Sequence, residues 1–169
     1  MNFDLRKLLV LLAAVAALVA GGCGGDDDES SDGGEPLSAD AYETEIQGIL
    51  QTFGEESVAI GGELQSATSA DDLAAGVGEL DTLTQTAVDD LNAIEPPEDA
   101  ADAHETLTTA LEGYLEDTGS LVEVVDSGDD QAIQAAGVEF QEAAVEVQSD
   151  IAEALQQLED AGIEPPSAP

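Results

Sequence analysis

The chain has 169 residues, with 39 Asp and Glu against two Lys and Arg, so its formal charge at pH 7 is −37. A charge of this sign argues against nucleic-acid binding, which needs Lys and Arg to neutralise phosphates, and against electrostatic docking on anionic lipid. The length suits one domain, the single cysteine excludes a disulfide within the chain, and an aromatic fraction of 3% predicts a core of small side chains.

The first 22 residues have the pattern of a secretory signal peptide, which is a short basic start, an apolar stretch and then small residues. Arg6 and Lys7 precede an apolar run over residues 8–20. This run is too short to cross a bilayer as a helix, which takes about 20 residues. We therefore expect residues 1–22 to be a signal peptide that is removed from the mature protein.

The small residues after this run end at the only cysteine, in the sequence Val19-Ala20-Gly21-Gly22-Cys23. This ending resembles the lipobox of bacterial lipoproteins, although Ala20 stands where that family usually has Leu. The resemblance implies that the thiol of Cys23 is diacylated and anchors an extracytoplasmic protein to the cell membrane, each buried methylene contributing about 0.8 kcal/mol. The alternative is cleavage by the ordinary signal peptidase after Ala20, with Cys23 left unmodified.

Residues 23–37 are expected to be the lipidated cysteine and a flexible acidic linker. Residues 24–36 offer no apolar side chain to a core, so nothing compensates the entropy lost on ordering them. Their carboxylates lack the spacing of an EF-hand loop, and a solvated spacer is expected rather than a calcium site. Removal of Arg6 and Lys7 with the signal peptide leaves His104 as the only cationic side chain.

From residue 38 onward the apolar residues recur at spacings of three and four, which predicts helices and no strand. Ser38 is placed to cap a first helix, whose core-facing residues are expected to be Tyr42, Ile46, Ile49, Phe53, Ser57, Ile60, Leu64 and Ala67. Ser69 and Asp72 have the spacing of a capping box for a second helix. That helix should end before Pro96-Pro97, and its core-facing residues are Leu73, Val77, Leu80, Leu83, Ala87, Leu91 and Ile94.

A third helix is predicted from about residue 97 to residue 126, with Ala100, His104, Leu107, Leu111, Tyr114, Thr118, Leu121 and Val125 on its core face. Ser127-Gly128-Asp129 should end this helix and cap the next. The fourth helix has the most regular pattern, and Gly162 followed by Ile163 suits a Schellman cap at its end. Its core face is expected to carry Ile133, Gly137, Phe140, Ala144, Val147, Ile151, Ala154 and Leu158.

Four helices of roughly 25 residues with connections of about 2 to 5 residues favour antiparallel neighbours. The predicted fold is therefore all-α, with an antiparallel up-down-up-down four-helix bundle over residues 38–163. The bundle follows the signal peptide and the disordered acidic linker, and residues 164–169 are expected to be a disordered tail.

The side chains present exclude the usual cofactors of helical bundles. A di-iron site needs two Glu-x-x-His pairs, but His104 is the only histidine and Ala101 stands three residues before it. Zinc sites need Cys and His ligands that are lacking, and a His-Met haem site has only Met1. A nucleophilic triad would have His104 as its one candidate base. We therefore expect no catalytic residue, no cofactor and no metal, and hence no enzyme.

His104 is the single candidate ligand residue. The alternative is a boundary residue near the bundle end, hydrogen-bonded to a backbone group or a carboxylate. By spacing, the acids of the third helix face outward and are expected to form a solvated surface; they are Glu112, Glu116, Asp117 and Glu123.

The segment from Leu91 to Leu107 combines a helix end of the form Leu-x-x-Ile-x-Pro-Pro with a short acidic stretch and a His-x-x-Leu helix. In this it is similar to uncharacterised small helical lipoproteins of actinobacteria-like envelopes. That resemblance implies no catalytic residue.

The expected function is that of a lipid-anchored extracytoplasmic helical-bundle protein with a non-enzymatic structural or protein-interaction role at the cell envelope. Its expected partners are the membrane, through acyl chains on Cys23, and envelope proteins or cations, but not nucleic acid. The alternative is an acidic binding module that takes cations or a small cationic ligand at its acidic surface or in a pocket between helices. A third possibility is an enzyme that uses His104.

Overall fold

The computed structural model describes residues 36–163. Over this range the chain is all-α, as predicted, and contains no strand. The four long helices and one short 3-10 helix are α2 (Ala39–Ser66), α3 (Ala70–Asn92), η2 (Glu98–Ala100), α4 (Ala101–Ser127) and α5 (Asp130–Asp160). The predicted signal peptide, Cys23, most of the predicted linker and the predicted C-terminal tail lie outside the described residues.

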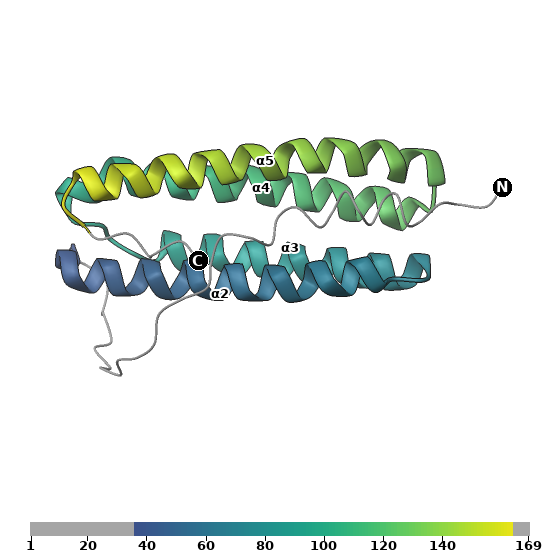
Figure 1. The fold of residues 1–169 in the computed structure, drawn as a ribbon, viewed down its shortest axis with the longest axis horizontal. Coiled ribbons are helices and arrows are strands. Elements are labelled where there is room, and N and C mark those ends of the chain that lie inside the picture. The colour runs from purple at the N-terminus through teal and green to yellow at the C-terminus, as the bar shows by residue number, and fades with distance from the viewer. Residues whose placement is uncertain (1–35, 164–169) are drawn as a thin grey trace.

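The long helices run along the long axis of the molecule, with α4 and α5 in one half and α2 and α3 in the other (Figure 1). Helices that follow one another in the chain pack together: α2 on α3, α3 on α4, and α4 on α5. Within residues 36–163 none of the helices has the length and apolar character needed to cross a membrane.

The starts of α2, α3 and α5 are the ones that the sequence predicts, whereas α4 begins at Ala101, after the 3-10 turn of η2, and not at about residue 97. The Ser38 hydroxyl accepts a hydrogen bond from the backbone N–H of Ala41 at 3.3 Å. Ser69 and Asp72 form the predicted capping box, because each side chain accepts from the other residue's backbone N–H, both at 3.1 Å. The Asp129 carboxylate caps α5. These bonds satisfy amide groups that have no partner inside a helix.

Two glycines in the left-handed conformation follow the ends of α4 and α5. Gly128 has φ 67° and Gly162 has φ 80°, values that favour glycine because it has no Cβ. The N–H of Ile163 donates to the carbonyl of Leu158 at 3.0 Å, and that of Gly162 donates to Glu159 at 3.0 Å. This pair of bonds is the predicted Schellman cap.

The core-facing residues agree with the predicted helix faces, with a few differences. In α2 the buried residue is Leu50, which is 3% exposed, whereas Ile49 is only partly buried. A step of four residues from Ile46 keeps the buried face turned toward the other helices, so Ile49 packs at its edge. Ile94 and Ile151 are also partly buried. The spacing did not select five further buried residues, which are Gly76, Thr84, Val88, Ala103 and Ala110.

Helices α2 and α3 approach closely at Gly76. A Cβ atom built there would lie 2.6 Å from Cδ2 of Leu64 and 3.0 Å from its Cγ. Leu64 is 1% exposed, so its side chain has little space to move away. The close contact between these two helices therefore depends on glycine at this position.

Packing begins one residue before the Ser38 cap. The backbone N–H of Leu37 donates to the carbonyl of Glu95 at 2.9 Å, and the Leu37 side chain packs against the core. The start of the helical domain is thereby joined to the connection between α3 and η2.

Candidate functional site

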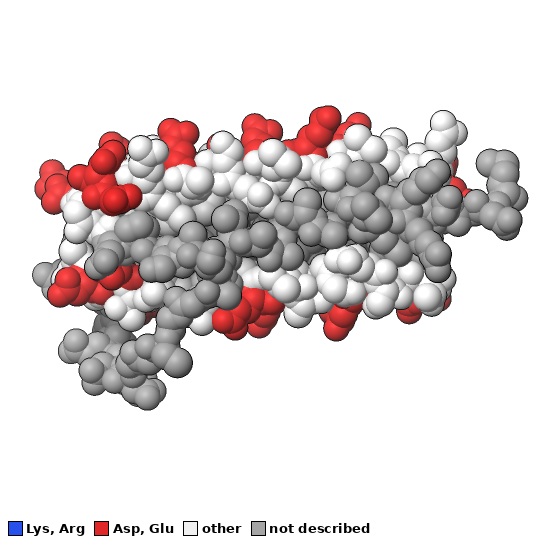
Figure 2. Space-filling model, in the orientation of Figure 1, with Lys and Arg blue, Asp and Glu red and all other residues white. Residues whose placement is uncertain are grey.

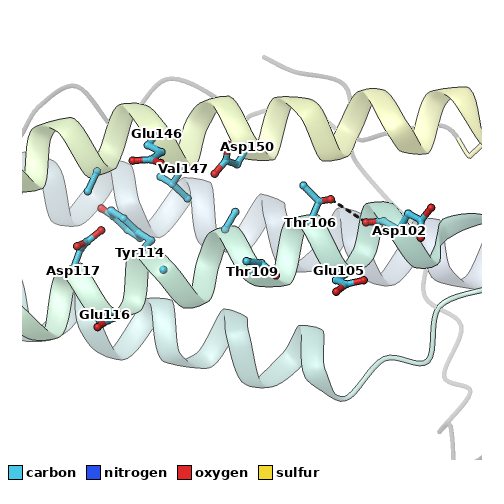
Figure 3. A pocket seen from close by; sticks show the side chains of 13 residues that line it. Asp102, Glu105, Thr106, Thr109, Tyr114, Glu116, Asp117, Glu146, Val147 and Asp150 are labelled. Atoms are coloured by element: carbon cyan, nitrogen blue, oxygen red, sulfur yellow. Dashed lines mark hydrogen bonds between the residues drawn. The ribbon is translucent and has the colours of Figure 1, made fainter.

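A groove with a volume of about 670 Å³ lies between α4 and α5. Figure 3 shows side chains from both helices along it. Ala110, Gly113 and Tyr114 of α4 and Ala143 and Val147 of α5 contribute to its lining. Six carboxylates also line it, four from α4 and two from α5: Asp102, Glu105, Glu116, Asp117, Glu146 and Asp150.

The groove exists because small residues face one another across the two helices. On α4, Thr106, Ala110, Gly113 and Asp117 are spaced by three or four residues, and residues at this spacing share one helix face. Gly113 leaves open space, since a Cβ atom built there would meet nothing within 4 Å. On α5, the small residue Ala143 lines the same groove.

Tyr114 lies at the end of the groove that Asp117 and Glu146 line, and it is the unusual residue of this site. Its side chain is 2% exposed, and its hydroxyl oxygen is buried with no hydrogen-bond partner among the described residues. The ring packs against Phe140 at a centroid distance of 5.3 Å and against Phe53 at 6.4 Å. Figure 3 shows the hydroxyl end pointing toward α5, on the side where Asp117 and Glu146 lie.

An unpaired buried hydroxyl is unfavourable, by about 1 to 3 kcal/mol for the desolvated group. Burial raises the pKa of the Tyr114 hydroxyl above its ordinary value of 10.0, and the negative charge of Asp117 raises it further. The phenol is thus held neutral, with an oxygen that can accept a hydrogen bond from a ligand.

The carboxylates around Tyr114 repel one another. Partial burial raises the pKa of Asp117, and the nearby charges of Glu116 and Glu146 raise it further. Residues 36–163 contain no Lys or Arg to offset these charges, and on the face drawn in Figure 2 no blue surface accompanies the red carboxylates of the described residues. The groove therefore has an electrostatic preference for cations.

The carboxylates of the groove do not converge on one point. Within the described part of the chain, no group of three or more His, Cys, Asp or Glu side chains is arranged to hold a metal ion. Asp102 and Asp117 are separated by 15 positions of one helix, which corresponds to about 22 Å at 1.5 Å per residue. The negative charge is spread along the groove.

His104, the predicted ligand candidate, lies on α4 but does not line the groove. Its Nδ1 is 3.2 Å from the hydroxyl oxygen of Tyr42, and the two rings meet edge to face with centroids 5.7 Å apart. Burial lowers the pKa of His104, while a hydrogen bond with the backbone of Leu91 opposes this effect. A neutral ring accepts a hydrogen bond from the Tyr42 hydroxyl at Nδ1, so the contacts are those of a boundary residue that joins α2 to α4.

Sequence reasoning missed the groove itself. It placed Glu116 and Asp117 on a solvated surface, and both are exposed as predicted, but it did not show that they line one groove with Glu146 and Asp150 of α5. The sequence feature that could have indicated the groove is the small size of Gly113 and Ala143, which lie near acidic residues on both helices. Cys23 lies outside the described residues, so lipid attachment there stays a prediction.

No family model matches this chain, and neither the curated proteins nor the solved structures that were searched contain a match. The functional assignment must therefore come from the site.

Proposed function

We propose that this protein is an acidic binding module that takes a cationic ligand in the groove between α4 and α5. One observation carries the proposal: Tyr114, whose buried hydroxyl has no partner among residues 36–163, lines a groove together with six carboxylates. An N–H group of a bound cation would donate to this oxygen, and its charge would offset the repulsion between Asp117 and Glu146.

The groove favours this role over a purely structural or protein-interaction role. Ser57 and Thr108 also have buried hydroxyls without a partner among the described residues, but only the Tyr114 hydroxyl belongs to a residue that lines the groove. The volume of the groove suits a small molecule, for which pockets of about 300 to 1,000 Å³ are usual. The proposed role is non-enzymatic. His104, the only histidine, contacts Tyr42 and is absent from the groove lining.

We also propose that the module works at the outer side of the cell membrane, anchored through acyl chains on Cys23. The lipobox-like ending of residues 19–23 supports this location. Mass spectrometry of the native protein should find a diacylated Cys23 at the mature N-terminus, and Cys23→Ala should move the protein from the membrane fraction to the soluble fraction. An unmodified thiol in the native protein would refute the anchor and leave the binding proposal standing.

The proposed arrangement of the helices is an antiparallel up-down-up-down four-helix bundle. The packing of consecutive helices and the short connections between them support it. Spin-label distances test it, because antiparallel neighbours place the end of one helix beside the start of the next. Long distances across the connections would contradict the arrangement.

Calorimetric titration of the full chain in detergent tests the binding function. Calcium, magnesium and polyamines are titrated separately at physiological salt, and at least one should give a saturable isotherm. The double variant Asp117→Asn/Glu146→Gln should weaken that binding at least tenfold, because it removes charge beside Tyr114. The control Glu123→Gln/Glu139→Gln removes the same charge from exposed positions of α4 and α5 outside the groove, and should change affinity less than twofold. Equal losses in both variants, or no saturable binding, would refute the proposal.

A further inference from the structure

We infer that the ligand of the groove is a linear aliphatic polyamine, that is, a flexible methylene chain with several ammonium groups. This inference rests on the proposed function and specifies its ligand class. It is carried by the spacing of the carboxylates, the apolar residues between them and the buried hydroxyl of Tyr114.

The spacing of the carboxylates favours an elongated cation over a compact one. Calcium needs six to eight oxygen ligands around one point, and magnesium needs a near-octahedral set. The groove has acids near one end at Asp102 and Glu105, and near the other at Glu116, Asp117 and Glu146, as Figure 3 shows. A ligand that neutralises both groups must extend along the helices.

The lining between the two acidic groups contains polar residues, among them Thr109 and Asp150, and also apolar side chains that are suited to methylene groups. Ala110 is 8% exposed and Val147 is 6% exposed, and both line the groove together with Ala143. An inorganic cation with its hydration shell gains nothing from apolar side chains, whereas an alkyl chain loses apolar surface to them. The open space at Gly113 leaves room for this chain in the groove.

The hydroxyl of Tyr114 supplies a specific contact at one end. It is a neutral acceptor, nearly fully buried, without a partner among the described residues, and it lies beside Asp117. An ammonium group has three N–H donors and no acceptor. It can therefore donate to the Tyr114 oxygen and keep further N–H groups for a neighbouring carboxylate such as that of Asp117.

The test compares cations of increasing length by calorimetry on the full chain in detergent. The probes are butylamine, putrescine, spermidine and spermine, with calcium and magnesium matched for ionic strength. Affinity should rise at least tenfold from putrescine to spermine at one ligand per chain, and divalent metal should compete only weakly. A similar affinity for putrescine and spermine would overturn the inference.

A variant that fills the groove without changing its charge gives a second test. Gly113→Leu places a side chain in the open space of the groove and should weaken spermine binding at least tenfold. The matched control is Gly62→Leu on α2, where a Cβ atom also meets nothing within 4 Å. It lies outside the groove and should not change affinity. Unaltered spermine binding in Gly113→Leu, with its helicity and Tm retained, would contradict the inference.

The two proposals fail in different ways. In one case calcium, magnesium or butylamine binds at one site, the double variant Asp117→Asn/Glu146→Gln weakens this binding, and spermine binds no more tightly than these probes. The binding function then stands, and the polyamine class is wrong. If none of the probes gives a saturable isotherm, both proposals are wrong.

Discussion

Two tyrosine-to-phenylalanine substitutions should change stability in opposite directions. Tyr42 and Tyr114 are both fully buried and both lose only a hydroxyl group when replaced by Phe. The Tyr42 hydroxyl lies 3.2 Å from Nδ1 of His104, whereas the Tyr114 hydroxyl has no partner among the described residues. The comparison isolates the effect of the hydrogen bond, because size and burial are matched.

The expected magnitudes follow from the state of each hydroxyl. Tyr42→Phe removes a hydrogen bond with a net value of about 0.5 to 1.5 kcal/mol, and it also leaves Nδ1 of His104 without that partner. Tyr114→Phe removes a buried polar group whose desolvation costs about 1 to 3 kcal/mol. The free energies of unfolding of the two variants should therefore differ by about 1.5 to 4.5 kcal/mol, with Tyr114→Phe the more stable.

Urea denaturation followed by circular dichroism measures this difference. The slope of the free energy with denaturant should stay constant, since neither variant changes the surface exposed on unfolding. In thermal melts, 1 kcal/mol corresponds to roughly 3 to 5 °C for a domain of this size. If Tyr114→Phe lost as much stability as Tyr42→Phe, the Tyr114 hydroxyl would have a partner in the free protein, and the argument for a ligand contact would fail.

Four further predictions concern packing, the titration of two aspartates and the effect of salt. Gly76→Ala should destabilise the protein relative to Gly78→Ala by about 1 to 3 kcal/mol in urea melts, because both gain the helix propensity of Ala but only the first Cβ meets Leu64; equal stabilities would refute the close contact. Hydrogen bonds from Ser69 and Thr68 lower the pKa of Asp72 below its ordinary value of 3.8. The ionised Asp72 carboxylate therefore stabilises the folded protein above pH 3.8, and this stabilisation is lost as the pH falls through the lowered pKa. The melting temperature of Asp72→Asn should accordingly lie below that of the wild type at pH 7, and the gap should narrow in acid. The pH dependence that Asp117 contributes has the opposite sign, because its pKa is raised and its contribution to stability is therefore lost as pH rises. Asp117→Asn should melt at a higher temperature than the wild type at pH 7, and this difference should disappear in acid. A lower melting temperature of the variant at pH 7 would contradict the raised pKa. Added salt should raise the melting temperature at pH 7, since it screens carboxylate repulsion, and a flat salt profile would show that repulsion has little effect.

The helix ends could be predicted from sequence because their signals are local. The Ser69–Asp72 box and the Gly162–Ile163 cap each lie within a few residues of one another, and the structure has both as expected. The helix faces were also largely predictable, since a spacing of three and four determines which residues share a face. The prediction chose Ile49 as the buried residue, whereas Leu50 is buried. This difference shows the limit of periodicity, because two adjacent apolar residues fit the same period equally well.

The groove could not be predicted by the same reasoning. It depends on how far apart α4 and α5 lie at Gly113 and Ala143, and on which acids of α5 come to face Asp117 of α4. Periodicity describes one helix at a time, and it does not predict which residues of one helix lie beside which residues of another. The unpaired state of the Tyr114 hydroxyl is likewise a tertiary property, because the same residue at the same spacing would have a partner in a differently packed interface.

The hydrogen bond between Leu37 and Glu95 has a mechanical consequence. A pulling force applied to the chain before residue 36 enters the helical domain at Leu37, and this bond passes part of the load to the connection between α3 and η2. The same end of α2 is held to α4 through Tyr42 and His104. Helix α2 is therefore held to its neighbours at the end where the force acts, so the force does not separate it from them one turn at a time.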